Sequence, residues 1–566
     1  MAGIVEIAKK AGVSPATVSR ALRGIHHVNE KTRKKIVDAA RDLDYPIRPD
    51  LLPRGANEKT NTIGVIAPFL SRWYFSQAIS GVEQALREAG MDLLLYNFAQ
   101  VDARQRVFQQ KKLVDKVDGL IVISLPPTDK EFKEILGLGI PVSLLGISDP
   151  RCSSVSIDTR RIENNSFFVA LKGTSFDANT FAKEALEKGA SFVLIDNGEF
   201  YLSEQTILVT DCLTTLQQLA SFHRKYLNLT IIALTGSNGK TTTKELFQIV
   251  LSRKYKTKAT LGNLNNHIGV PLTLLSFTKE TEIGIVEMGA NHQKEIAFLC
   301  EIAQPDFGYI TNFGKAHLEG FGGVEGVIKG KSEMYDYISA TDKKVFVNLD
   351  DSIQYTKTMK MNQITFSNST PDGFIYIDKI EANPFVKINY QNIEIQSNLI
   401  GLYNATNIMA AITVGRYFNV DNEEIKQALE SYQPDNNRSQ IIYQNSNEII
   451  LDAYNANPSS MDVALQNFIQ LGKASKIAVL GDMFELGNES HLEHRSIVKK
   501  LRLEANFNCY LIGKEFYLAK EHKSNLHFFQ TFDEFSAYLK DNPIQNSIIL
   551  IKGSRGMALE RILKYI

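Results

Sequence analysis

Apolar and polar residues alternate along this chain in two ways, which predict helices at the front and strand–helix units over the rest. Residues 1–48 have the apolar spacing of helices, whereas short apolar runs of strand length recur from residue 61 onward. Four such runs precede residue 150, and segments with helical periodicity separate them: TIGVIAP, MDLLLYNF, GLIVIS and IPVSLLG. This alternation predicts parallel α/β structure.

The pattern also predicts several domains, because 566 residues exceed what one hydrophobic core can hold. Pro49, Pro53 and Gly55 mark residues 49–60 as a linker. A nucleotide-type block begins near Ile231, and the last block has strands at KIAVLGD, NCYLIG and SIILIKG. The expected blocks are residues 1–48, 61–150, 152–228, 229–435 and 436–566. The predicted fold class is therefore α/β multidomain.

Composition indicates a globular protein, with 44% hydrophobic and 22% charged residues. The formal net charge is zero, so the whole chain has no polyanion-binding signature. Residues 1–58 are the exception, because they hold 11 Lys and Arg against 7 Asp and Glu. A nucleic-acid partner is therefore compatible with that segment alone.

The cysteines and the apolar runs indicate a cytoplasmic location. Cys152, Cys212, Cys300 and Cys509 are far apart and form no CxxC pair, which argues against a disulfide framework and a zinc site. The N-terminal residues lack the apolar core of a signal peptide. No apolar run approaches the roughly 20 residues that span a bilayer.

The sharpest motif is IIALTGSNGKTTTKE, residues 231–245, in which an apolar strand enters a glycine-rich turn that opens a helix. Backbone N–H groups of such a turn bind phosphate, Lys240 would reach the β and γ phosphates, and Thr241 would bind Mg²⁺. Leu234 occupies the position of the first glycine of the general phosphate-loop pattern, so this loop is a shorter variant. The expected ATP-binding residues of the loop are Gly236, Ser237, Asn238, Gly239, Lys240, Thr241 and Thr242.

The loop resembles that of the Mur ligases, which build the peptide stem of the cell-wall precursor. The resemblance implies three α/β domains over residues 152–566, with ATP and Mg²⁺ as cofactors. Making an amide from a carboxylate needs activation to an acyl phosphate, and cations must neutralise the negative charge that gathers there. In this family the residues matching Glu287 and His317 bind metal, and the lysine matching Lys331 is carbamylated. Lys329 is a nearby alternative, but the context favours Lys331.

Three further segments resemble the family's nucleotide contacts. GLYNATNIMAA, residues 401–411, places Asn404 and Asn407 near the adenine, with Tyr403 where many relatives have His. Arg438 matches the arginine that approaches the ATP phosphates. The catalytic residues that the resemblance implies are Lys240, Glu287, His317, Lys331 and Arg438. In DAYNANPSSM, residues 452–461, Asp452 matches a ribose contact, and Asn455 and Asn457 match residues near the reacting groups.

Other segments are similar to the family member that adds D-alanyl-D-alanine to UDP-N-acetylmuramoyl-tripeptide, which makes these two molecules the expected partners. They are GNLNNHIGVPLTLL, LGDMFELGNESHLEH, KGSRGM and residues 156–190. The implied substrate residues are Asp158, Thr159, Arg160, Lys172, Gly173, Asn263, Asn266, Gly269, Asn455 and Asn457. A member that adds a single amino acid is an alternative, and the third stem residue, lysine or diaminopimelate, stays open.

The front of the chain resembles a different family, the lactose-repressor-type regulators. VEIAKKAGVSPATVSRALRG, residues 5–24, predicts a helix–turn–helix whose second helix starts at Ser14 with Pro15 in its first turn. Residues 61–148 resemble the first half of that family's periplasmic-binding-protein-like effector domain. The resemblance places Pro15, Ala16 and Arg20 at base-reading positions and Thr17, Ser19 and Asn29 near phosphates.

Two interpretations of this combination are open: a fusion that both binds operator DNA as a transcription regulator and ligates precursor, or a join of unrelated genes whose front is a remnant. The second is favoured, because half an effector domain has no ligand cleft and a helix–turn–helix of this type needs a dimer. Pro53 and Gly55 also stand where a hinge helix needs helix formers. The usual lead-in before Ser156 is replaced, which leaves the state of the uridine site open.

Overall fold

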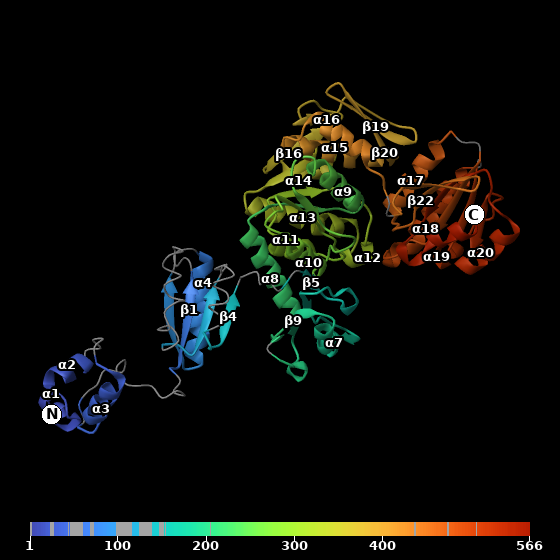
Figure 1. Cartoon of the computed structure of the whole chain (residues 1–566). Helices are drawn as coiled ribbons and strands as arrows, with labels where there is room; N and C mark the ends of the chain where they lie inside the picture. The colour runs from blue at the N-terminus through green and yellow to red at the C-terminus, as the bar shows by residue number, and fades with distance from the viewer. Residues whose placement is uncertain are drawn as a thin grey trace. The chain divides into compact units, whose positions relative to one another are not determined.

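The structure is a computed structural model that falls into two compact units, Met1–Ser148 and Asp149–Ile566. Figure 1 traces the chain of each unit from end to end. The described residues are 3–22, 28–43, 45, 60–67, 73–97, 116–123, 138–145, 152, 154–203, 205–434, 437–472, 475–504 and 507–566. The linker prediction for Pro49, Pro53 and Gly55 lies outside them.

The front of the first unit contains the predicted helix–turn–helix, built from α1 (Ile4–Ala11), α2 (Pro15–Leu22) and α3 (Glu30–Arg41). Gly12 adopts a left-handed φ of 65° at the end of α1, a conformation that suits glycine. Ser14 Oγ accepts the Thr17 amide at 3.2 Å and so caps α2, as expected. Ile7, Val18 and Ile36 form the centre of the core of this bundle.

The same unit contains a parallel sheet of order β2-β1-β3-β4. The four predicted strands are confirmed: β1 (Thr62–Ala67), β2 (Asp92–Asn97), β3 (Gly119–Ile123) and β4 (Val142–Leu145), with α4 (Trp73–Glu88) after β1. The Asp118 carboxylate accepts the amides of Thr60 and Asn61 at 2.6 Å, which ties the start of β1 to β3. The relation of this four-stranded sheet to an effector domain stays a prediction.

The second unit begins with a small parallel sheet of order β10-β9-β6-β5. Its strands are β5 (Ser154–Ser156), β6 (Ser166–Val169), β9 (Ala190–Ile195) and β10 (Thr206–Leu208). α7 (Ala182–Glu187) contributes to the core on one face, while α8 (Cys212–Leu227) contributes Leu216 to the other. α8 then leads into the next sheet.

A seven-stranded parallel sheet, here called the central sheet, has the order β12-β13-β11-β14-β15-β16-β17. Its strands are β11 (Thr230–Thr235), β12 (Thr257–Ala259), β13 (Ile283–Glu287), β14 (Phe307–Ile310), β15 (Lys344–Asn348), β16 (Asn362–Ser367) and β17 (Ile375–Tyr376). Strands this apolar need cover on both faces, which α9 (Lys240–Leu251), α10 (Gly269–Ser276), α11 (Glu295–Ala303), α13 (Val324–Ala340) and α15 (Tyr403–Tyr417) supply. The adjacent carboxyl ends of β11, β13 and β14 form one edge, the usual ligand edge of such a sheet.

Three further sheets belong to the described part of the unit, the smallest of which pairs β7 (Lys172–Gly173) with β8 (Phe176–Asp177). A small antiparallel sheet contains β18 (Lys379–Ala382), β19 (Phe385–Tyr390) and β20 (Ile393–Ile400). The last sheet has the order β21-β22-β26-β23-β24-β25, with β21 (Gln440–Gln444) antiparallel and the rest parallel. The parallel strands are β22 (Asn447–Asp452), β23 (Lys476–Gly481), β24 (Asn508–Ile512), β25 (Leu526–Phe529) and β26 (Ile548–Lys552), and they include the three predicted ones. Among the described helices, none has the length and apolar content needed to cross a membrane.

The two units should unfold independently, because each has its own core. The single tryptophan of the chain, Trp73, lies in α4 of the first unit and reports on that unit alone. Adding ADP with Mg²⁺ should raise the thermal midpoint followed by far-UV circular dichroism by several degrees and leave the tryptophan-fluorescence midpoint unchanged. Equal shifts of both midpoints would contradict independent units.

Candidate active site

A glycine-rich turn joins β11 to α9 at the ligand edge of the central sheet. Gly236 has φ 146° and Gly239 has φ 80°, and a Cβ on Gly236 would lie 1.9 Å from Thr311 Oγ1. Only glycine therefore fits at residue 236. Lys240, the first residue of α9, donates from Nζ to the Gly236 carbonyl at 2.8 Å, so its ammonium folds back over the turn. Burial lowers the pKa of Lys240.

Glu287 stands at the end of β13 beside the turn and is 2% exposed. The Thr241 hydroxyl donates to Glu287 Oε2 at 3.0 Å, and Asn265 Nδ2 donates to Oε1 at 2.8 Å. Lys244 Nζ lies 3.8 Å from Oε2. Two of the four predicted metal-binding residues, Thr241 and Glu287, are thus in direct contact. A hydroxyl and a carboxylate are hard oxygen ligands, which suit Mg²⁺.

His317 lies at the N-cap of α12 (Leu318–Phe321) with a left-handed φ of 53°. Its Nδ1 lies within ion-pair distance of the carboxylate of Glu485, a residue of the segment after β23. Glu485 also has a positive φ, 63°, a conformation that is rare for L-amino acids. The contact therefore joins two such residues, one in a loop of the central sheet and one in a loop of the last sheet. Burial lowers the pKa of His317, while the Glu485 carboxylate acts in the opposite direction.

Lys331 lies on α13 and is 1% exposed, with Nζ 5.3 Å from the centre of the Phe321 ring. Among the described residues its ammonium has neither a hydrogen bond nor an ion pair. Burial lowers the pKa of Lys331 well below its ordinary value, and the positive charge of Lys240 adds to this. Lys329, by contrast, is exposed.

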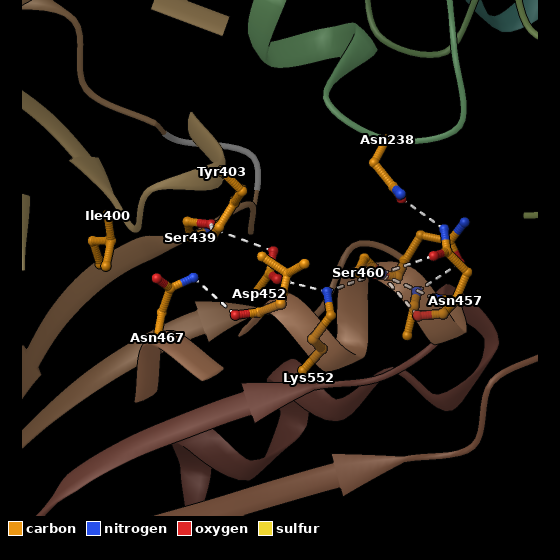
Figure 2. Close-up of polar contacts among 12 residues, drawn as sticks. Asn238, Ile400, Tyr403, Ser439, Asp452, Asn457, Ser460, Asn467 and Lys552 are labelled. Atoms are coloured by element: carbon orange, nitrogen blue, oxygen red, sulfur yellow. Dashed lines mark hydrogen bonds and ion pairs between the residues drawn. The ribbon is translucent and has the colours of Figure 1, made fainter. Parts of the chain in front are cut away.

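Arg438 and Asp452 come from the start of the last sheet. The guanidinium of Arg438 stacks on the Tyr454 ring at 3.8 Å. Its Nε is buried without a hydrogen-bond partner among the described residues, and Arg438 lines the same cleft as the phosphate loop. Asn457 Nδ2 donates to Asn238 Oδ1 at 2.7 Å, a direct link from the last sheet to the phosphate loop that Figure 2 shows.

These elements enclose a cleft of about 850 Å³, a volume typical of a small-molecule site. The cleft is lined by most of the residues that were predicted to bind ATP, metal or substrate in this part of the chain: Ser237, Asn238, Gly239, Lys240, Thr241, Thr242, Asn263, Asn266, Glu287, His317, Asn404, Asn407, Arg438, Asp452, Asn455 and Asn457. Gly236, Gly269 and Lys331 stand behind this lining. Residues far apart in the sequence thus converge on one cleft.

The predicted uridine-site residues lie outside the cleft lining, in the turn after β5 and in the short strand β7 (Lys172–Gly173). The guanidinium of Arg160 bonds to the Asp158 carboxylate at 2.8 Å and lowers the pKa of Asp158 to about 2. Thr159 follows Asp158 in the same short turn. Lys172, next to Gly173, pairs with Asp196 at 2.7 Å. The structure therefore groups Asp158 with Arg160, and Lys172 with a carboxylate that sequence reasoning missed.

Comparison with known proteins agrees with this geometry. The family description "Mur ligase middle domain" matches residues 234–415, and "Mur ligase, glutamate ligase domain" matches residues 437–555. The UDP-N-acetylmuramoyl-tripeptide–D-alanyl-D-alanine ligase of Bacillus subtilis (strain 168) is 34% identical over 422 residues, which is 72% of this chain and 92% of that protein. The chain belongs to the Mur ligase family. The Escherichia coli (strain K12) ligase of the same name is 30% identical over 427 residues, 74% of this chain and 94% of the relative.

Solved structures agree with the Mur ligase fold. The crystal structure of MurF from Acinetobacter baumannii superposes with a TM-score of 0.66 at 32% identity, covering 73% of this chain and 92% of that chain. MurF from Thermotoga maritima in complex with ADP gives a TM-score of 0.64 at 26% identity, covering 74% and 98%. At the front, the description "Bacterial regulatory proteins, lacI family" matches residues 3–47 alone.

Sequence reasoning missed several residues that shape this Mur ligase site. The expected substrate residues include Asn263 and Asn266 but not Asn265, whose amide donates a hydrogen bond to the Glu287 carboxylate. Asn312 clamps the phosphate loop, because it accepts the Asn238 amide and donates to the Asn238 carbonyl, both at 3.0 Å. The position of Asn312 just after β14, at the ligand edge, was the available signal.

Proposed function

We propose that this protein joins D-alanyl-D-alanine to UDP-N-acetylmuramoyl-tripeptide at the expense of ATP, in peptidoglycan precursor synthesis. The observation that carries the proposal is the cleft in which Lys240, Thr241 and Glu287 of the central sheet face Arg438 and the segment after β22. The names of the Bacillus subtilis and Escherichia coli relatives, which this chain matches over more than nine-tenths of their length, supply the substrates.

The chemistry follows from the charges in the cleft. The tripeptide carboxylate attacks the γ-phosphorus of ATP, ADP leaves, and an acyl phosphate forms. The dipeptide amine then attacks the acyl carbon, phosphate leaves, and the amine loses a proton. Both steps gather negative charge, which Lys240 and Arg438 are placed to neutralise. The contact between Asn238 and Asn457 links the two halves of the cleft, so that closure excludes water.

Thr241, Glu287, His317 and Lys331 are the residues that would hold Mg²⁺. The donor set fits the ion, because the Thr241 hydroxyl and the Glu287 carboxylate are buried, in contact and beside the phosphate loop. When bound, the ion supplies further neutralisation of phosphate charge. In this proposal Asn404 and Asn407 face the adenine, and Asp452 faces the ribose.

Lys331 is proposed to carry a carbamate. An amine attacks CO₂ only when it is neutral, and the burial of Lys331 favours the neutral form. The N–C bond forms, a proton leaves the nitrogen, and the side chain changes from a neutral amine to an anion with oxygen ligands. This change would also remove the repulsion between the ammonium groups of Lys331 and Lys240.

A second candidate function, operator binding, rests on the front unit. Pro15, Ala16 and Arg20 are exposed on α2, as base-reading residues must be. Thr17 and Ser19 are half-buried, and Thr17 Oγ1 lies 2.7 Å from Ser14 Oγ. Asn29 caps α3 by accepting the Thr32 amide at 2.9 Å, so its side-chain oxygen is already used. Pro15 and Ala16 have no hydrogen-bonding side chain, which leaves Arg20 as the main direct reader.

The carbamate predicts a labelled signal. Protein equilibrated with ¹³C-bicarbonate should show one slowly exchanging carbamate carbon by NMR, and Lys331→Gln should lose both this signal and nearly all turnover. Lys329→Gln, which changes an exposed lysine two residues away, should keep both. A signal that survives Lys331→Gln would place the carbamate elsewhere.

The ligase function predicts that purified protein releases phosphate from ATP only when UDP-N-acetylmuramoyl-tripeptide and D-alanyl-D-alanine are both present. Lys240→Ala should lower turnover by at least about a thousandfold, the size of other losses of a phosphate-transfer cation. The exposed-lysine control Lys360→Ala should match the wild type. Turnover retained by Lys240→Ala would refute the phosphate-loop assignment.

Two other results would replace the proposed function. Turnover with a single amino acid in place of the dipeptide would indicate a different Mur ligase activity. Absence of phosphate release, together with a gel shift of palindromic operator DNA, would favour the regulator function.

A further inference from the structure

A chain of polar contacts runs from α15 to the middle of the last sheet, and Figure 2 shows its members. The Tyr403 hydroxyl lies 2.5 Å from Ser439 Oγ, and the Ser439 amide donates to Asp452 Oδ1 at 3.2 Å. Lys552 Nζ then donates to Asp452 Oδ2 at 2.6 Å. The contacts therefore connect the helix that carries the predicted adenine residues to the KGSRGM segment, to which no role has been assigned so far.

Lys552 is the last residue of β26, which lies between β22 and β23. It is directly opposite Asp452 of β22 in the parallel register. The whole residue is only 2% exposed, and Asp452 is the one carboxylate within ion-pair distance among the described residues. A second contact, to the Asn455 carbonyl at 3.3 Å, reaches the loop that follows β22. A charge this buried needs such partners, because desolvation is costly.

The ion pair fixes more than one carboxylate. Both Asp452 oxygens are occupied, one by Lys552 and the other by the Ser439 amide, so the side chain has one orientation. The Tyr454 amide also donates to the Asn437 carbonyl at 3.2 Å, which holds the two strand-end segments together on either side of Arg438. The position of Arg438 over the cleft thus depends on the same small network.

We propose that Lys552 is a positioning residue of the ligase: its ion pair orients Asp452 and, through Ser439, the Arg438 segment toward the nucleotide. The inference rests on the proposed function, because that function places the nucleotide beside Asp452. Lys552 acts through Asp452 and is not itself a contact to the reacting atoms. The Tyr403 hydroxyl joins this network to the central sheet's helices, so the tyrosine contributes a specific hydrogen bond as well as packing.

Two other roles make different predictions. A lysine that merely holds the last sheet together would lower stability when removed and leave nucleotide affinity unchanged. A lysine that binds phosphate directly from the cleft wall, which Lys552 partly lines, would matter whether or not Asp452 keeps its charge. A double-mutant cycle separates both roles from positioning.

The experiment measures the ADP dissociation constant by calorimetry, and KM and kcat by turnover, for Lys552→Met, Asp452→Asn and the double variant of the full chain. Each single change should weaken ADP binding by about tenfold, and the double variant should be no weaker than Asp452→Asn, because the two residues act as one unit. KM for ATP should rise in parallel, while KM for the dipeptide stays within about twofold. Lys552→Arg, which keeps the charge, should restore most of the affinity.

Lys476→Met is the matched control. Lys476 is a lysine of the neighbouring strand β23, and its Nζ donates to backbone carbonyls, including that of Ile469 at 2.7 Å, and lies 5.9 Å from the centre of the Phe507 ring. Its removal should lower the thermal midpoint and leave ADP affinity unchanged. An additive loss in the double variant, or an equal loss of affinity in Lys476→Met, would overturn the proposal.

The experiment remains decisive even if the Lys552→Met variant fails to fold. If Lys552→Met does not accumulate as folded protein, the double variant leaves no unpaired charge buried, and its comparison with Asp452→Asn decides the question. ADP binding is measured without turnover. Absence of turnover in the wild type would therefore count against the proposed function, and an additive cycle would count against the role of Lys552.

Discussion

The phosphates of ATP and the carboxylate of the substrate repel one another, and the proposed reaction requires this cleft to hold them together. Much of the structure around the cleft neutralises or positions these negative charges. The phosphate loop, Glu287 and Asp452 all lie at carboxyl ends of parallel strands, where backbone and side-chain donors converge. Buried cations oppose them: Lys240 over the loop, Lys244 beside Glu287 and Lys552 beside Asp452. The apolar strands and helices behind them provide the rigid support that holds these charges in place.

Local signals in the sequence predicted a large share of this structure. The turn at Gly236–Gly239, the apolar strands and the cap at Ser14 each depend on neighbours within a few residues, so periodicity and spacing were enough to find them. The pairing of Lys552 with Asp452 could not be predicted in this way. It depends on β26 inserting between β22 and β23, and strand order is a tertiary property. The contact of Asn265 could not be predicted for the same reason, because its partner is Glu287 on another strand.

The two units of the chain differ in how far their parts contribute to one site. The second unit brings motifs of a single reaction into one cleft, so its parts explain one another. The first unit has a helix–turn–helix and a four-stranded parallel sheet, each with its own core. Its lacI-family match ends at residue 47, before the sheet begins. The sheet's likeness to half of an effector domain therefore stays a prediction from the sequence of residues 61–148.

If the cleft makes an amide through an acyl phosphate, a carboxylate oxygen of the tripeptide must be transferred to the released phosphate. UDP-N-acetylmuramoyl-tripeptide labelled with ¹⁸O in its terminal carboxylate is turned over with unlabelled ATP and D-alanyl-D-alanine, and the released phosphate is analysed by mass spectrometry. An acyl phosphate transfers one carboxylate oxygen to each phosphate, so we expect one ¹⁸O per phosphate released. Unlabelled phosphate, formed at the same rate as product, would contradict it.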